Sequence, residues 1–518
     1  MQVFQRMHSY SQTPQARTEP QSLAPDIQGA MEREKSAQNG KAAQDQKHGV
    51  REMENMDYIV HSETDECCSP IMEHFSLDIF GNNPRLNQLY TQLCFCFQLP
   101  HWSQSNDNII THIQRGLDVL TSSFPWVAGQ VIHANDGNFT IVPLVKTPQL
   151  LVQDRSKQLP TFEEYRNAGF PFKWLNEKDI ASHSTLPDVR TEPAPVLALQ
   201  ATFIRGGVFL TFSAQHNCMD MAGQCQMIRL FAKACHEAVY FTDEELTIGN
   251  LPRKHIIPLL DDLPKTSEEV IAKEPNNDSS QAPDAESEAE AAWSYFLFSC
   301  TALLTLKLRA QKDIHTTFVS TDDTLCAFIW KQVTKARLNR LQDMSTSTQS
   351  TFERQVDVRR HLGLPTTYTG NAVYKTSTTR SVENVLHKSL GYLASELRAS
   401  LSPTPDLGYS ARKAATMLHQ QLRANKPDVV TVTRAKLPAM DIKMSSWAKE
   451  DCYNFDFGGA LGKPEAVRRP NFEGWEGLAY LMPKSRDGEI AVAVCLRDED
   501  LRILQADEEF GRFVRYVD

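Results

Sequence analysis

The chain has 518 residues, of which 41% are hydrophobic and 23% are charged, a composition typical of globular proteins with more than one sizeable core. Its formal net charge of -10 argues against a nucleic-acid-binding protein, which usually carries a strongly basic face, and favours a small neutral or locally bound anionic ligand. The 11 cysteines include no CxxC pair and no metal-like Cys/His spacing, which predicts reduced thiols in a cytoplasmic protein without a metal site.

Residues 1–68 are predicted to form a disordered tail. They are rich in Gln, Glu, Lys, Ala and Ser and hold few aliphatic side chains, so they cannot bury enough apolar area to offset the entropy of ordering. They also lack the apolar core of a signal peptide, and a start at Met53 or Met56 would leave the preceding stretch outside the protein. The longest apolar run, 291–308, is too short and too polar to span a bilayer, so we expect a soluble protein.

Residues 69–260 are predicted to form an N-terminal lobe of mixed α and β structure, because apolar residues alternate in some segments and recur at helical spacing in others. The sequence Gly206-Gly207 favours the turn of a hairpin whose second strand runs toward His216. In chain order, the predicted elements are a strand at 93–97, a helix at 108–120, a strand after 126, the hairpin at 196–216 and an amphipathic helix at 227–239.

Residues 261–290 are acidic and rich in Pro, Ser and Asn, which predicts a flexible linker between two lobes. The C-terminal lobe, 291–518, repeats the mixed pattern, so we expect an α+β fold of two similar-sized lobes with a groove between them that suits a ligand. Its predicted elements are strands at 295–299, 352–360, 476–483 and 489–496 and helices at 301–311, 321–338 and 498–510.

The pattern HxxxD occurs three times, and only the copy formed by His216 and Asp220 has a context that suits chemistry. The copy at His61 lies in the predicted tail, and the copy at His74 and Asp78 lies at the start of the fold. His216 ends a hydrophobic strand beside a helix start, where an imidazole with a pKa of about 6.5 suits a general base. A strand-end histidine bonded to backbone is the alternative. Asp220 is compatible with a helix N-cap and with a residue that orients the histidine turn.

Two further stretches stand out. Gly458, Gly459 and Gly462 predict a tight loop, and because they match neither GxGxxG nor a P-loop they give a nucleotide-binding site little support. Asp357 and Arg359 are predicted to share one face of a strand. Arg359 could form a bidentate pair with a carboxylate or remain an exposed strand arginine, and the local sequence leaves both open.

Together these stretches resemble the motifs of the BAHD superfamily of acyl-CoA-dependent acyltransferases, in particular its fungal, trichothecene 3-O-acetyltransferase-like branch. HNCMD is similar to the family's HxxxD, DFGGALGKP to its DFGWGKP, VDVRRHLGLPTTYTGN to its DxRxR and YxGN segment, and FPWVAGQV to its PxxAGR. The similarity covers 69–518. The sequence departs from the family where the tryptophan of DFGWG is absent and where His361 replaces the second arginine of DxRxR.

The resemblance implies two lobes arranged as in chloramphenicol acetyltransferase, with a channel that acyl-CoA, foremost acetyl-CoA, and the acceptor enter from opposite faces. His216 matches the family's catalytic base, and Asp220 matches its structural aspartate, for which Arg359 is the candidate partner. The second motif supports the channel away from the reacting atoms; its matching residues here are Asp456, Phe457, Gly458, Gly462, Lys463 and Pro464. The candidates for binding the phosphates of CoA, with a solvated basic surface as the alternative, are Lys463, Arg468 and Arg469.

The predicted activity is direct transfer of an acyl group from CoA to a hydroxyl of a fungal secondary metabolite, with His216 as base. No acyl-enzyme is needed, so Cys218 and Ser213 are interpreted as packing residues. We expect a monomer with a small-molecule hydroxylated acceptor, no metal, and no nucleic-acid or membrane partner. The alternatives are a catalytically degenerate acyl-CoA-binding protein and a condensation-type enzyme acting on a carrier-bound substrate. The sequence identifies no donor for the oxyanion of the reaction.

Overall fold

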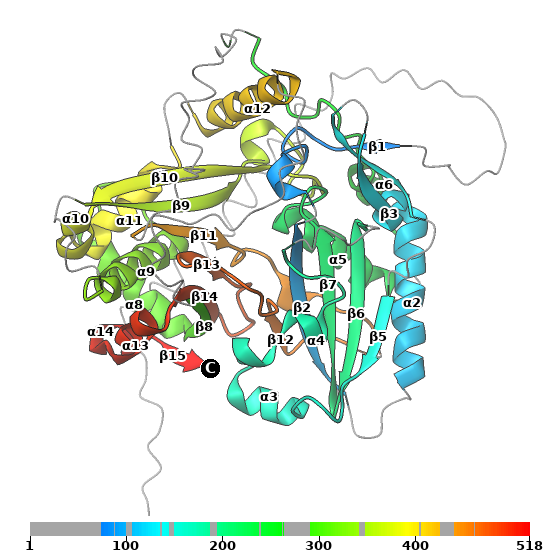
Figure 1. Ribbon diagram of the computed structural model, residues 1–518, viewed down its shortest axis with the longest axis horizontal. Coiled ribbons are helices and arrows are strands. Elements are labelled where there is room, and N and C mark those ends of the chain that lie inside the picture. The colour runs from blue at the N-terminus through cyan, green and yellow to red at the C-terminus, as the bar shows by residue number, and fades with distance from the viewer. Residues whose placement is uncertain are drawn as a thin grey trace, which may run out of the picture. The chain divides into compact units, whose positions relative to one another are not determined.

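Two large β-sheets, each with helices packed on it, organise the chain (Figure 1). The structure is a computed structural model, and 66–518 make up one of its two units. It describes residues 74–87, 89–99, 106–134, 137–144, 150–186, 194–237, 240–261, 263, 291–340, 348–402, 406–424, 440–459 and 461–517. The predicted tail at 1–68 and nearly all of the predicted linker at 261–290 therefore lie outside the described residues.

The first large sheet has the strand order β12, β2, β7, β6, β5 within the described residues. Its strands span, in that order, Ala466–Arg468, Tyr90–Gln98, Gly207–Gln215, Leu197–Ile204 and Leu150–Asp154. β6 and β7 form the predicted hairpin, and Gly206 takes the positive φ of +81° that its turn requires. Because β7 ends at Gln215, His216 follows the end of a central strand of this sheet.

Helices α2 (Asn106–Ser123) and α5 (Met221–Ala234) pack on one face of this sheet through apolar side chains at helical spacing. The apolar stripe of α2 includes Ile109, Ile113 and Leu117, which lie in the same core as the aromatic residues of β2. The remaining elements of this half are α3 (Phe162–Ala168), α4 (Glu177–Ile180), α6 (Asp243–Gly249) and a small sheet of β1 (Phe75–Ser76), β4 (Phe139–Pro143) and β3 (Gly129–His133).

The second large sheet has the order β10, β9, β11, β13, β14, β8, β15 within the described residues. Its strands span, in that order, Val373–Ser381, Gln349–Asp357, Ile442–Ser446, Leu478–Leu481, Ile490–Arg497, Ala291–Phe298 and Arg515–Val517. One face packs on helices in a separate core (Figure 1). The helices of this half are α8 (Cys300–Ala310), α9 (Thr321–Arg337), α10 (Val382–His387), α11 (Leu390–Ala399), α12 (Leu407–Ala424), α13 (Asp498–Ala506) and α14 (Glu508–Gly511).

The two halves are joined by side chains and by one strand. Trp293 and Tyr295 of β8 point from the second sheet into the core of the first, where Phe172 stacks on Trp293 at 5.2 Å between ring centroids. Strand β12 comes from the C-terminal half but pairs with β2, placing Val467 opposite Phe95. The predicted lobe boundary at 261–290 does not account for this return of the chain.

The predicted α+β class with two mixed lobes is confirmed. The predicted strand at 352–360 is too long, because β9 ends at Asp357 and Arg359 has a helical backbone with φ -49° and ψ -52°. The predicted strand at 295–299 and helix at 301–311 correspond to β8 and α8, which divide the apolar run 291–308 between them. Across the described ranges, no helix combines the length and the apolarity that crossing a membrane requires.

Candidate active site

The main chain around His216 is held on both sides by hydrogen bonds from distant segments. Its backbone N–H donates to the carbonyl of Leu89 at 2.7 Å. The side-chain amide of Asn371 donates to the carbonyls of His216 (2.9 Å) and Asn217 (2.8 Å). These bonds fix the direction in which the imidazole leaves the backbone, which is the first requirement of a side chain that must meet a substrate in one geometry.

The imidazole of His216 is half-buried, and its Nδ1 is buried without a hydrogen-bond partner on any other residue that the structure describes. Burial lowers the pKa of His216 below its usual value, against a hydrogen bond to its own main chain and the charge of Asp220, which raise it; the cations of Arg469 and Lys443 make smaller lowering contributions. The ring is therefore neutral at neutral pH, the form that accepts a proton. Because Nδ1 is enclosed, Nε2 is the nitrogen left to face a substrate.

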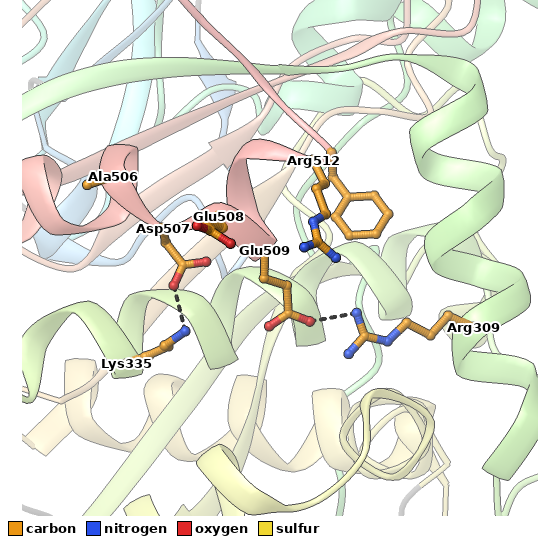
Figure 2. A pocket seen from close by; sticks show the side chains of 8 residues that line it. Arg309, Lys335, Ala506, Asp507, Glu508, Glu509 and Arg512 are labelled. Atoms are coloured by element: carbon orange, nitrogen blue, oxygen red, sulfur yellow. Dashed lines mark hydrogen bonds and ion pairs between the residues drawn. The ribbon is translucent and has the colours of Figure 1, made fainter.

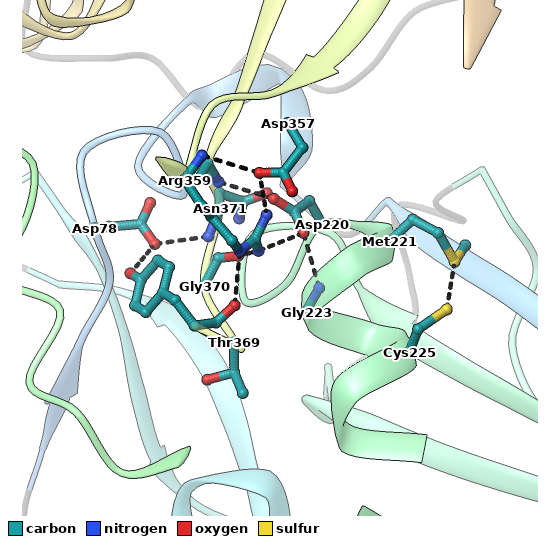
Figure 3. Close-up of polar contacts among 12 residues, drawn as sticks. Asp78, Asp220, Met221, Gly223, Cys225, Asp357, Arg359, Thr369, Gly370 and Asn371 are labelled. Atoms are coloured by element: carbon teal, nitrogen blue, oxygen red, sulfur yellow. Dashed lines mark hydrogen bonds and ion pairs between the residues drawn. The ribbon is translucent and has the colours of Figure 1, made fainter. Parts of the chain in front are cut away.

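Asp220 is both a helix N-cap and a residue that holds the histidine turn, the two interpretations with which the sequence is compatible (Figure 3). Its Oδ1 accepts the backbone N–H of Gly223 at 2.9 Å, as an N-cap of α5 does, and also accepts Arg359 Nη2 at 2.7 Å. Its Oδ2 accepts the backbone N–H of Ala372 at 2.8 Å. Both oxygens are thus used by the protein, so Asp220 positions the turn that carries His216.

Arg359 is completely buried and makes four contacts that join separate segments (Figure 3). Besides Asp220, it donates from Nη1 to Asp357 Oδ1 (3.0 Å), from Nε to the carbonyl of Tyr368 (2.9 Å) and from Nη2 to the carbonyl of Gly370 (2.8 Å). The alternative of an exposed strand arginine is wrong, because the chain leaves the strand after Asp357 and turns Arg359 inward.

The sequence did not point to Asp78 as a site residue, although the structure places it beside the same turn. Its carboxylate is buried and accepts the backbone N–H of Gly81 (2.7 Å), the hydroxyl of Tyr368 (2.8 Å) and the backbone N–H of Asn371 (2.8 Å). Burial raises the pKa of Asp78, and these bonds and the cation of Arg253 oppose the rise. Asp78 thereby fixes the residue that holds the carbonyl of His216.

The contact between α5 and the segment after β9 leaves no room for a larger side chain. A Cβ on Gly223 would lie 2.3 Å from the carbonyl oxygen of Thr369.

Glu450 is a further acidic residue of this region. Burial, together with the carboxylates of Asp220 and Asp357, raises the pKa of Glu450 to about 7. No local sequence pattern identifies Glu450, since its shift arises from neighbours that are far away in the sequence.

The glycine loop is a packing feature at the other end of α5. Gly458 and Gly462 take positive φ values of +83° and +65°, and the N–H of Phe457 donates to the carbonyl of Gly462 at 2.8 Å. Phe457 is buried against Phe95 at 5.3 Å between ring centroids, and Gly458 N–H donates to Asp456 Oδ1 at 3.0 Å. His236, which follows α5, contacts the carbonyl of Asp456 at 3.0 Å. A helix of this length separates its two ends by about 20 Å, so the loop lies far from Asp220.

The three candidates for phosphate binding lie in different surroundings. Lys463 is exposed, whereas Arg468 and Arg469 are buried. The alternative interpretation, that these residues form a solvated basic surface, is therefore wrong for both arginines. Arg468 donates to the hydroxyl of Tyr453 (3.1 Å) and the carbonyl of Gly169 (3.2 Å), and its guanidinium is thus engaged within the protein. Their assignment to CoA stays a prediction, and the burial of the arginines weighs against it.

A surface pocket between α8, α9 and the C-terminal helices contains none of these residues (Figure 2). Two ion pairs lie in it: Arg309 with Glu509 at 2.6 Å, and Lys335 with Asp507 at 2.6 Å. None of the described residues that line this pocket is a histidine or a cysteine. In the part of the chain that the structure describes, no cluster of three His, Cys, Asp or Glu side chains could hold a metal ion.

Comparison with known proteins places this arrangement in a family. Residues 89–235 match the family described as the trichothecene 3-O-acetyltransferase-like N-terminal domain. The chain is 44% identical over 455 residues to O-acetyltransferase dmxR13 of Cryptosporiopsis sp. (strain 8999), covering 85% of this chain and 97% of that protein. It is 40% identical over 462 residues to trichothecene 3-O-acetyltransferase TRI101 of Fusarium sporotrichioides, covering 85% and 96%.

A solved structure agrees with these relatives. TRI101 of F. graminearum, complexed with coenzyme A and deoxynivalenol, is similar with a TM-score of 0.78 and 38% identity, covering 86% of this chain and 100% of that one. Since relatives with this identity extend over most of the chain, the resemblance seen in the four motifs is confirmed. The chain belongs to the trichothecene 3-O-acetyltransferase-like family of fungal acyltransferases within the BAHD superfamily.

Proposed function

We propose that the protein transfers an acetyl group from acetyl-CoA to a hydroxyl group of a small secondary metabolite, with His216 as general base. The observation that carries this proposal is a half-buried imidazole whose backbone is held from both sides and whose pKa is lowered by burial. The relatives named O-acetyltransferases support acetyl as the acyl group, and the relative bound to coenzyme A and deoxynivalenol supports CoA as the carrier and a small molecule as the acceptor.

The reaction proceeds in one transfer without an acyl-enzyme. His216 Nε2 takes the proton of the acceptor hydroxyl, and the oxygen attacks the thioester carbonyl. The resulting tetrahedral oxyanion collapses, the carbon–sulfur bond breaks, and the imidazolium returns its proton to the thiolate of CoA. Cys218 is unsuited to a nucleophilic role, because it is fully buried and burial raises its pKa to about 12.

The pH dependence follows from the lowered pKa of His216. The base form is fully present above this pKa and disappears as the pH falls through it, so a lowered pKa extends activity toward acid. We expect log kcat/KM to be level between about pH 7 and 8 and to fall with unit slope below a midpoint under 6.5. Initial rates measured in buffers of constant ionic strength give this midpoint directly. A midpoint above 6.5 would contradict the proposed environment of His216.

The function is tested with purified protein, acetyl-CoA and a panel of hydroxylated terpenoids, alkaloids and polyketides. Release of the CoA thiol is followed by a thiol reagent, and the product is identified by mass spectrometry. We expect thiol release that requires an acceptor and matches the acetylated product in amount. Equal release without acceptor would indicate a thioesterase. Tight binding of CoA with no turnover on any acceptor would favour the degenerate acyl-CoA-binding protein, and both outcomes would overturn the proposal.

A further inference from the structure

Cys225 and Cys452 are two buried thiols that touch where the two halves of the chain meet. Their Sγ atoms lie 3.5 Å apart, although the residues are separated by 227 positions in the sequence. Cys225 is 2% exposed and Cys452 is fully buried, and every cysteine that the structure describes is a free thiol. Neither thiol has a part in the proposed acyl transfer, so this contact is independent of that reaction.

The first turn of α5 fixes the position of Cys225. Asp220 caps this helix through the backbone N–H of Gly223 and pairs with Arg359, so the start of α5 cannot shift without breaking buried bonds. The thiol of Cys225 donates to Met221 Sδ at 3.5 Å, one turn earlier in the helix (Figure 3). The Cys225 side chain is therefore held at a defined place on the helix.

Two arginines fix the segment that carries Cys452. This cysteine begins a short 3₁₀ helix, Cys452–Asn454. Arg486 donates from Nη1 to the carbonyl of Tyr453 at 2.7 Å, and Arg468 donates from Nη1 to the hydroxyl of Tyr453 at 3.1 Å. The two sulfur atoms are thus brought together by segments that are each held by other bonds.

The sulfur atoms are close enough to bond after a small movement. A disulfide has an S–S length of about 2.05 Å, so the two atoms must approach by roughly 1.5 Å. Rotation of the two side chains about χ1 moves the sulfurs without moving the backbone.

The surroundings of the pair favour an uncharged product. Burial and the neighbouring Cys452 raise the pKa of Cys225, and the carboxylates of Glu450 and Asp220 add to the rise. A disulfide is uncharged, as the two thiols are, so bridging leaves the charge of this core unchanged. It therefore suits the pair better than a metal ion, whose cysteine ligands are thiolates.

We propose that Cys225 and Cys452 form an oxidative modification site, at which hydrogen peroxide produces a disulfide that joins α5 to the C-terminal half and stabilises the protein. The two thiols together lose two protons and two electrons, the S–S bond forms, the O–O bond of the peroxide breaks, and two water molecules leave. A sulfenic acid formed first on one cysteine lies in contact with the partner thiol, which favours the disulfide over further oxidation.

The bridge is expected to raise the resistance of the protein to unfolding. It closes a loop of 227 residues, and long loops restrict the unfolded chain most. We therefore expect the midpoint of thermal unfolding to rise by about 5 °C after oxidation and to return to its original value on reduction. Because both thiols are buried, peroxide reaches them only when this contact opens locally, so the bridge should form slowly.

The test treats the reduced full-length protein with hydrogen peroxide, alkylates the remaining thiols and maps the disulfides by digestion and mass spectrometry. We expect a linked pair of peptides that contains Cys225 and Cys452, is absent from C225S and C452S, and separates on reduction. The matched control is C300S. Because Cys300 is only half-buried and is not part of the contact, its loss should leave the bridge in place.

Thermal unfolding separates a bridge between the halves from oxidation elsewhere. Peroxide should raise the midpoint in the wild type and in C300S but not in C225S or C452S. Circular dichroism before treatment establishes that each variant is folded, and one folded variant of the two suffices. The inference is overturned if Cys225 and Cys452 stay free after Cys300 has been oxidised completely, if either one links to another cysteine, or if their bridge leaves the midpoint unchanged.

Discussion

The variant His216→Ala is expected to lower kcat by roughly 10²–10⁴-fold, because it removes the group that takes the acceptor proton. The binding of CoA should survive, since the bonds that hold this turn come from the backbone of His216 and from Asn371 and are independent of the imidazole. Stopped assays of acetyl transfer give the rate, and isothermal titration with CoA gives the affinity.

The matched control is His236→Ala. His236 contacts the carbonyl of Asp456 at 3.0 Å and lies beyond the C-terminal end of α5, far from Asp220 at its start. We expect this variant to keep wild-type turnover. If His216→Ala retained its rate, or if both histidine variants lost theirs equally, His216 would not be the base.

The variant Arg359→Leu is expected to lower the free energy of unfolding by about 3–5 kcal/mol, because it leaves the buried carboxylate of Asp220 without its cation. It also leaves the carbonyls of Tyr368 and Gly370 without a donor. Arg359→Lys should recover little of the loss, since an ammonium group cannot reproduce the planar set of bonds. Equilibrium denaturation with guanidinium chloride measures the change.

An exposed ion pair of the β9–β10 hairpin provides the control. Lys375 pairs with Glu353 at 2.9 Å, but the lysine side chain is 56% exposed. Lys375→Met should therefore cost no more than about 1 kcal/mol. Equal losses in the Lys375 and Arg359 variants would contradict the view that burial makes the Arg359–Asp220 pair indispensable.

Several elements could be predicted because they depend on local periodicity. The hairpin before His216, the helix now seen as α2 and the division of 291–308 into β8 and α8 each follow from side chains within one segment. The N-cap role of Asp220 is local as well, because the backbone N–H that it accepts in this role belongs to Gly223, three residues further along the chain.

Other elements could not be predicted, because partners far apart in the sequence decide them. β12 is a strand of three residues that gains its stability by pairing with β2, from the other half of the chain. The turn that takes Arg359 out of β9 is decided by acceptors on Asp220 and the 368–370 segment. The side-chain pattern within 352–360 carries no information about these distant acceptors, so it predicts a strand that continues beyond the observed end of β9.

The sequence by itself therefore determined the family and the α+β class, and it singled out His216 and Asp220 as candidate site residues, because motifs and capping patterns are encoded within short segments. Only the tertiary structure decided how the site is held and which charged side chains are buried. Asp78 and Asn371 are separated by 293 residues, and the buried guanidinium of Arg469 is surrounded by aromatic rings that come from several segments. Hydrogen bonding, burial and electrostatic interaction depend on distance in space, which sequence separation does not reveal.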